Sequence, residues 1–215
     1  MLMSLWRGVV ELVAPLVCAA CDVPLGPEQG AFCAACEPLA ERVLAGPDPD
    51  VRALYQYGGP VADAVWRLKY EGRSEIASAL APALSQVALP WQGSVDLVLP
   101  VPITSGRLRE RGYNQSALLA RGVARALDLP FRPGWLRRVR AGPRQVGKAR
   151  ALRLSGIRDA FLASSRVQGR AVLVVDDVYT TGATLAEARR ALEAAGAPRV
   201  RGLVLALADE RADSA

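Results

Sequence analysis

Histidine is absent from all 215 residues of this chain. Its absence excludes the common general base, Ser-His and Cys-His nucleophile pairs, and histidine metal sites. Any chemistry must therefore use carboxylates, lysine, tyrosine, arginine, backbone amides or a bound metal. Lysine is also scarce, because only Lys69 and Lys148 among the 27 basic residues are not arginine. Arginine makes forked contacts with phosphate and carboxylate, so the bias suits anionic partners, although a GC-rich coding bias explains it equally well.

Long uninterrupted apolar runs are missing near the start of the chain. The stretch over residues 5–17 is broken by Arg7, Glu11 and Pro15, so it is too short and too charged for a membrane span and lacks the clean core of a secretory signal. We therefore expect a cytoplasmic protein. The stretch predicts an amphipathic helix that packs on the body, with one face formed by Leu5, Val9, Leu12, Val13 and Leu16.

The only four cysteines form two CxxC pairs, Cys18/Cys21 and Cys33/Cys36, separated by eleven residues. Four thiolates at this spacing suit a tetrahedral zinc ion, and the intervening segment, rich in Pro and Gly, needs such a cross-link because it has little to build a core from. Two disulfides are the alternative, but cytosolic thiols stay reduced. With four protein ligands, no position stays open for a catalytic water, so we predict a structural zinc module.

Apolar runs alternate with amphipathic segments along the rest of the chain, which predicts an α/β fold with a parallel central sheet. We assign residues 1–46 to the N-terminal helix and four-cysteine module, 46–50 to a linker and 51–210 to the α/β domain. The expected strands are 51–59, 95–102, 171–175 and 199–207, and the expected helices are 61–70, 74–89, 113–127 and 183–196, the last ended by Gly196.

The stretch VLVVDDVYTTGAT, residues 172–184, carries the strongest chemical signal. Asp176 and Asp177 follow an apolar strand, where ligands of open α/β sheets bind. The small residues that follow lead into a helix whose free N–H groups suit a phosphate, and Gly182 permits positive φ. An anion cradle beside two acceptor carboxylates matches a sugar phosphate. Two alternatives stay open: a bare Mg²⁺ site, and a capping box in which Thr184 and Glu187 only start the helix.

These thirteen residues also resemble the phosphoribosyl pyrophosphate (PRPP) signature of type I phosphoribosyltransferases, with no departing position. The resemblance implies that Asp176 and Asp177 bind the ribose hydroxyls with Mg²⁺ present, and that the 5′-phosphate is held by Thr180, Thr181, Gly182, Ala183 and Thr184. With the cysteine pairs, LKY at 68–70 and RERGYNQ at 109–115, the chain from Cys18 to about Leu207 resembles the ComF family of competence-associated phosphoribosyltransferase-like proteins. That family has the type I phosphoribosyltransferase fold with an N-terminal zinc module.

The pyrophosphate of PRPP needs a second set of donors. We expect them in the loop after the strand at 95–100, from Arg107, Arg109 and Arg111, with Asn114 and Gln115 opening the next helix; a solvated basic turn is the alternative. Residues 137–153 resemble the loop that closes over PRPP, where Gln145 and Lys148 are the candidate contacts and a loop without a role is the alternative. Lys69 is expected to face the site rather than solvent.

The segment from Gly106 to Arg170 has sixteen basic residues and three acidic ones, so single-stranded DNA is a further possible partner, with Tyr113, Phe131 and Trp135 available for stacking. The ComF resemblance implies a role in natural transformation, and the zinc module could dock a helicase of the uptake machinery. Three functions remain open: a phosphoribosyltransferase with an unknown acceptor, a non-catalytic DNA-binding module, and a PRPP-sensing regulator. The oligomeric state is not written in the sequence.

Overall fold

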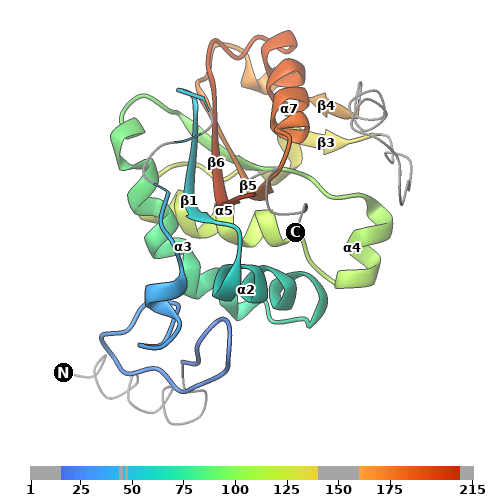
Figure 1. Cartoon of the computed structure of the whole chain (residues 1–215). Helices are drawn as coiled ribbons and strands as arrows, with labels where there is room; N and C mark the ends of the chain where they lie inside the picture. Colours follow the sequence, from blue (N-terminus) through green and yellow to red (C-terminus); the bar gives the residue numbers. More distant parts are fainter. Residues whose placement is uncertain (1–15, 44–45, 47, 140–159, 209–215) are drawn as a thin grey trace, which may run out of the picture.

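The computed structural model describes residues 16–43, 46, 48–139 and 160–208 (Figure 1). Most of the helix expected over residues 5–17 lies outside these ranges, as do the candidate loop residues Gln145 and Lys148. None of the described helices has the length and apolar character needed to cross a membrane.

A four-stranded parallel sheet forms the centre of the protein. Its order is β1-β6-β5-β2, with β1 at Val51–Gln56, β2 at Leu97–Pro100, β5 at Val172–Tyr179 and β6 at Val200–Leu207. Leu97 pairs with Val172 and Val172 with Val200, so β2, β5 and β6 begin level, whereas β1 begins two residues further along, with Val51 opposite Gly202. The α/β prediction is thus confirmed, and the apolar runs became strands because a parallel sheet is buried on both faces.

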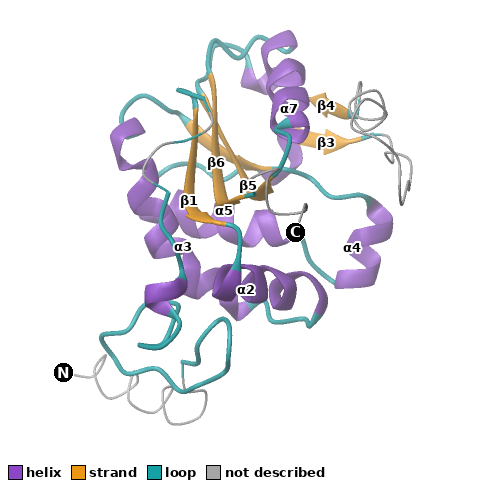
Figure 2. Cartoon of the chain, in the orientation of Figure 1, coloured by secondary structure: helices purple, strands orange, loops and turns teal. Residues whose placement is uncertain are grey.

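Helices and a small sheet cover the two faces of the central sheet (Figure 2). Leu173 and Val175 of β5 pack into one core with α2 (Gly59–Tyr70), α3 (Glu75–Ala88) and α5 (Gln115–Ala126). Val172 and Val174 pack into the other with α7 (Ala183–Ala194) and the β3–β4 pair. Side chains alternate along a strand, so each strand feeds both cores. Short 3₁₀ helices occupy Glu37–Leu39, Leu89–Trp91, Pro133–Trp135 and Ser165–Val167.

The four-cysteine segment packs against the β1 edge of the domain. Its Phe32 meets Tyr55 of β1 edge-on, with ring centroids 5.7 Å apart, and both rings are buried. The Gln56 amide donates to the Glu41 carbonyl at 2.8 Å, so the chain just after the cysteines covers the open side of β1. The segment therefore shares one hydrophobic core with α2 and the sheet. The division at residues 46–50 stays a prediction.

Three local predictions were wrong. Ser105–Arg111, expected as a loop, is helix α4, because the Thr104 side chain caps its start and Gly112, at φ 80°, ends it. The strand before the site runs to Tyr179, so Asp176 and Asp177 lie within β5 and not after it. Gly182 is the N-cap of α7, which rules out the capping box of Thr184 with Glu187.

The segment expected as a closing loop over 137–153 starts inside a strand. β3 (Leu136–Arg138) pairs antiparallel with β4 (Phe161–Ala163). Leu136 and Phe161 are buried against the sheet, which explains why these short strands form beside a polar, basic sequence.

Candidate active site

Two buried carboxylates mark the site where β5 meets the start of α5. The side chains of Asp176 and Asp177 belong to residues that are only 8% and 5% exposed. Ser116 Oγ donates to Asp176 Oδ1 at 2.8 Å, and Gln115 Nε2 donates to Asp177 Oδ2 at 2.7 Å. Neighbouring strand residues point to opposite faces, yet both carboxylates find partners in the first turn of one helix, because that turn lies near the carboxyl end of the sheet.

A lysine and an arginine join this pair of carboxylates. Lys69 Nζ lies 3.1 Å from Asp177 Oδ1, so the side chain of α2 reaches the site. Arg111 Nη1 donates to Gln115 Oε1 at 3.1 Å, and its guanidinium lies 4.9 Å from the Tyr70 ring centroid. The side-chain amide of Gln115 thus bridges Arg111 and Asp177: its oxygen accepts from Arg111 at the end of α4, and its nitrogen donates to Asp177 of β5.

The pKa of Asp176 departs strongly from that of an ordinary carboxyl. Burial and the adjacent charge of Asp177 raise the pKa of Asp176 to about 7, while the hydrogen bond from Ser116 partly offsets them. At neutral pH this carboxyl is therefore poised between its acid and carboxylate forms, and a bound cation would favour the carboxylate.

A shallow, open pocket lies between Asp176 and the start of α7. Gly182 enters α7 with φ 74°, as the sequence predicted, and the first turn of a helix leaves N–H groups without backbone partners. The pocket combines these donors with the residues Thr180 and Thr184, which suits an anion such as phosphate. Its lining comprises Asp176, Val178, Tyr179, Thr180, Gly182, Ala183, Thr184 and Leu185.

The structure places two predicted contacts in supporting roles. Thr181 is not part of the pocket lining, and its Oγ1 accepts from the Ala183 amide at 3.4 Å. Asn114 caps α5 by accepting from the Ser116 amide, and its Nδ2 donates to the Val101 carbonyl at 3.0 Å. Asn114 therefore fixes the first turn of α5 to the end of β2, which holds Gln115 and Ser116 in position.

The other basic candidates lie around the site. Arg107 and Arg109 of α4 are exposed. Burial and the nearby charge of Arg107 lower the pKa of Arg138 on β3, while the Asp176 carboxylate raises it. Arg138 also lies over the Phe161 ring, 5.3 Å from its centroid. A second group of cations thus gathers on the side of the site formed by β3 and α4.

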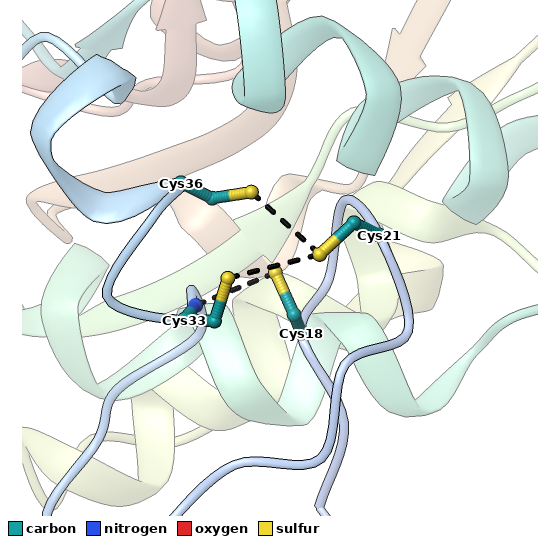
Figure 3. A group of neighbouring side chains, drawn as sticks. All are labelled: Cys18, Cys21, Cys33 and Cys36. Carbon is teal, nitrogen blue, oxygen red and sulfur yellow. Dashed lines mark hydrogen bonds between the residues drawn. The ribbon is translucent and has the colours of Figure 1, made fainter.

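The four cysteines lie together in space, with their side chains turned toward one another (Figure 3). Their Sγ atoms lie within 4.8 Å of one another, and Cys21 Sγ is 3.7 Å from those of both Cys33 and Cys36. Tetrahedral thiolates around zinc at 2.3 Å would be about 3.8 Å apart, whereas a disulfide needs about 2.05 Å. The backbone amide of Cys36 lowers the pKa of the Cys33 thiol, whereas burial and the neighbouring thiols raise the pKa of the Cys36 thiol. The cluster can hold a metal ion such as zinc.

Comparisons with known proteins place the chain in a family. Residues 114–214 match the phosphoribosyl transferase domain. The DNA utilization protein YhgH of Salmonella typhimurium is 34% identical over 218 residues, covering 88% of this chain and 96% of that protein. Competence protein F of Haemophilus influenzae is 30% identical over 158 residues, or 67% of each chain. The chain belongs to the ComF family of phosphoribosyltransferase-like proteins.

Among solved structures, this ComF protein is similar to a glutamine PRPP amidotransferase from B. subtilis. The two are 24% identical, with a TM-score of 0.45, over 65% of this chain and 30% of that enzyme.

Three residues of the ComF protein that contribute to the site were not predicted to do so. Ser116 lies in the first turn of α5, where a serine suggests nothing beyond the helix start. Arg138 reaches the site only because β3 pairs with β4, which no period in the sequence indicates. Tyr179 lies inside the recognised motif and lines the pocket, so the motif could have revealed it.

Proposed function

We propose that the protein binds PRPP with Mg²⁺ and transfers its 5-phosphoribosyl group to an acceptor, releasing pyrophosphate, in natural competence. The observation that carries this proposal is the meeting of three parts: the paired carboxylates of β5, the lysine that reaches them, and the open pocket at the start of α7. The competence role is supported by relatives named as competence and DNA utilization proteins.

The pocket and the carboxylates would bind different parts of PRPP. In our proposal, Thr180, Thr184 and the amides of the first turn of α7 hold the 5′-phosphate. Asp176 and Asp177 accept hydrogen bonds from the ribose hydroxyls. As the bond from the ribose to pyrophosphate breaks, positive charge builds on the ribose ring, and the two carboxylates stabilise it electrostatically.

The cations on the opposite side neutralise the leaving group. In our proposal, Arg107, Arg109 and Arg138 bind the pyrophosphate; the support is that the charges of Arg107 and Asp176 both act on Arg138. Mg²⁺, when bound, would add positive charge at the pyrophosphate oxygens. Lys69 pairs with Asp177 in the free protein. We expect it to shift toward phosphate oxygens when the ligand arrives, so that neither charge is left buried alone.

Calorimetry with PRPP and Mg²⁺ tests the binding step, and a pyrophosphate-release assay across candidate bases tests turnover. We expect Asp177→Asn to weaken PRPP binding at least tenfold (about 1.4 kcal/mol) because a buried carboxylate partner is lost. Asp63→Asn, at an exposed acid of α2, is the matched control and should bind as the wild type does. Absence of binding at millimolar PRPP would refute the site, and binding without release for any base would indicate a PRPP-sensing regulator.

For the cysteine cluster we propose one structural zinc ion in a cytoplasmic protein. The support is the fit of the Sγ separations to a tetrahedral S₄ site. The four cysteines would fill all four positions of a tetrahedral zinc ion and leave none for a substrate. The metal would therefore stabilise the fold and take no part in catalysis.

A second candidate function, binding of single-stranded DNA, is favoured by the surroundings of Trp135. The guanidinium groups of Arg132 and Arg170 lie 5.8 Å and 5.9 Å from its ring centroid, and both arginines are exposed. Aromatic rings flanked by cations suit stacked bases and their phosphates. Charge reversal at Arg132 and Arg170 should weaken binding of a labelled oligonucleotide and flatten its salt dependence, whereas Asp177→Asn should not. Unchanged binding in the reversed variant would exclude this surface.

A further inference from the structure

An aspartate next to a metal-ligating position connects the four-cysteine segment to α2. Asp22 directly follows Cys21 and has φ 62°, a left-handed conformation that only a few side chains adopt readily. Its carboxylate accepts from two arginines of the α/β domain: Arg67 Nη2 contacts Oδ2, and Arg73 Nη1 lies 2.7 Å from Oδ1. The Asp22 carboxylate therefore ties the cysteine segment to two places: Arg67, in the last turn of α2, and Arg73, just after the helix ends.

The last turn of α2 is held from a second direction as well. Tyr113, just before α5, donates its hydroxyl to the Leu68 carbonyl at 2.6 Å, and Leu68 itself is fully buried. Arg67 also pairs with Glu71 at 3.2 Å. These contacts fix the rotation of the turn that carries Lys69.

The rotation of this turn decides where Lys69 points. Residues two apart on a helix differ by about 200°, so a helix anchored through Arg67 on one side presents Lys69 on nearly the opposite side. That side faces β5, where Lys69 Nζ lies 3.1 Å from Asp177 Oδ1. Asp22 and Asp177 thus contact opposite sides of the same turn.

We propose that Asp22 is a positioning residue that sets Lys69 against Asp177 and so couples the metal-binding cysteine segment to the carboxylate site. Exposed ion pairs contribute little on average. This one differs because two guanidinium groups share one carboxylate and the Arg67 side chain is only 15% exposed. Arg67 Nη1 is buried without a hydrogen-bond partner among the described residues, so loss of Asp22 would leave its charge less well compensated.

The scarcity of lysine gives a direct test that needs no ligand. Lys69 and Lys148 are the only lysine side chains, so an amine-reactive label followed by peptide mass spectrometry reports Lys69 against an internal reference. Asp22→Asn removes the charge while asparagine tolerates the left-handed backbone. We expect Lys69 to react about three- to tenfold faster in Asp22→Asn, equivalent to a coupling of roughly 1 kcal/mol, with Lys148 unchanged.

Two controls make the labelling result decisive. Asp63→Asn removes an exposed charge from the same helix and should leave Lys69 labelling at the wild-type rate. Metal analysis must show equal metal content in all three proteins, so that a lost ion is not the cause. An unchanged labelling rate in Asp22→Asn at full metal content would overturn the proposal.

An effect of Asp22 on PRPP binding through Lys69 rests on the proposed function, and a double-mutant cycle tests it. In calorimetry with PRPP and Mg²⁺, Asp22→Asn should weaken binding about threefold to tenfold in the wild-type background and have no effect in a Lys69→Met background. Equal effects in both backgrounds would show that Asp22 does not act through Lys69. If the wild type binds no PRPP, the proposed function fails, while the labelling experiment still decides the positioning role.

Discussion

The Ser116 hydroxyl donates a 2.8 Å hydrogen bond to Oδ1 of Asp176, so a side chain of α5 holds a buried carboxylate of β5. This bond favours the ionised form of a group whose pKa burial and Asp177 together raise to about 7. Burial and Asp177 raise the pKa of Asp176 and the Ser116 hydrogen bond lowers it, so a substitution at any of these contacts should shift that pKa.

Thermal stability should fall with rising pH because of Asp176. The pKa of the folded-state carboxyl, about 7, lies above the ordinary 3.8, so the folded protein binds the extra proton between these values. Stability from this group is therefore full below pH 4, is lost as pH rises toward 7 and is constant above it. Melting curves from pH 4 to 8 should show a flatter profile and a higher melting temperature at pH 8 for Asp176→Asn. A variant profile parallel to that of the wild type would contradict the raised pKa.

PRPP affinity should show the opposite trend. The ribose hydroxyls and Mg²⁺ favour the carboxylate, so affinity should rise toward pH 7 and level off above it. Ser116→Ala removes the bond that lowers the pKa of Asp176, so the midpoint of the affinity profile should move to higher pH. The phosphate groups of PRPP also titrate, but they affect both proteins equally, so the difference between the two midpoints reports on Asp176. A midpoint at lower pH in Ser116→Ala would refute the assignment.

Gln115 should matter for both affinity and folding. Gln115→Leu removes the donor to Asp177 and the acceptor for Arg111 at similar side-chain volume, so a buried charged group loses a hydrogen bond and the melting temperature should fall. The same loss frees both charged groups from the side chain that positions them, so PRPP binding should weaken about tenfold. Gln92→Leu, at an exposed glutamine, is the control and should change nothing. Calorimetry measures the affinities, and equal affinities for the two variants would exclude a role for Gln115.

Much of the fold could be predicted because its signals are local. The strands at 95–102, 171–175 and 199–207 follow from apolar runs, since a parallel sheet buried on both faces needs them. Helix α4 was missed because SGRLRER has a single apolar residue, Leu108, and hence no apolar stripe. Its signals were at its ends, in the cap Thr104 and the left-handed Gly112.

In the candidate site, too, residues within one local motif could be predicted, and residues that depend on distant contacts could not. The carboxylates and the Thr180–Thr184 loop lie in one continuous motif, so sequence reasoning reached them together. Ser116, Arg138 and Asp22 depend on contacts between distant segments, and no spacing along the chain indicates those contacts. Lys69 lay between these cases, because its neighbours in LKY supported a role but only the packing of α2 brings it to Asp177.

Metal removal should loosen the packing of the cysteine segment on the sheet domain. Cys18 and Cys33 are buried in the same core as Phe32 and Tyr55, so losing the cross-link should lower the melting temperature. We expect one zinc equivalent per chain by metal analysis and four titratable thiols after denaturation in chelator. Less than half an equivalent of zinc together with no free thiols would show disulfides instead.

Gly182→Ala offers a sharp test of the α7 loop because the chain provides a matched control. Gly182 has φ 74° and an added Cβ would lie 2.2 Å from Oη of Tyr179, whereas Gly93 has φ 76° and no atom within 4 Å of such a Cβ. Both alanine variants carry the same backbone strain, about 1 kcal/mol, so their difference isolates the clash with Tyr179.

The clash must move the Tyr179 ring, the loop, or both, and each change alters the pocket that Tyr179 lines. Gly182→Ala should therefore lose PRPP binding at least tenfold, measured by calorimetry, while Gly93→Ala binds normally at a similar cost in melting temperature. Tyr179→Ala in the Gly182→Ala background should recover part of the lost stability, since it removes the colliding ring. Normal PRPP binding by Gly182→Ala would mean that the start of α7 does not hold the phosphate.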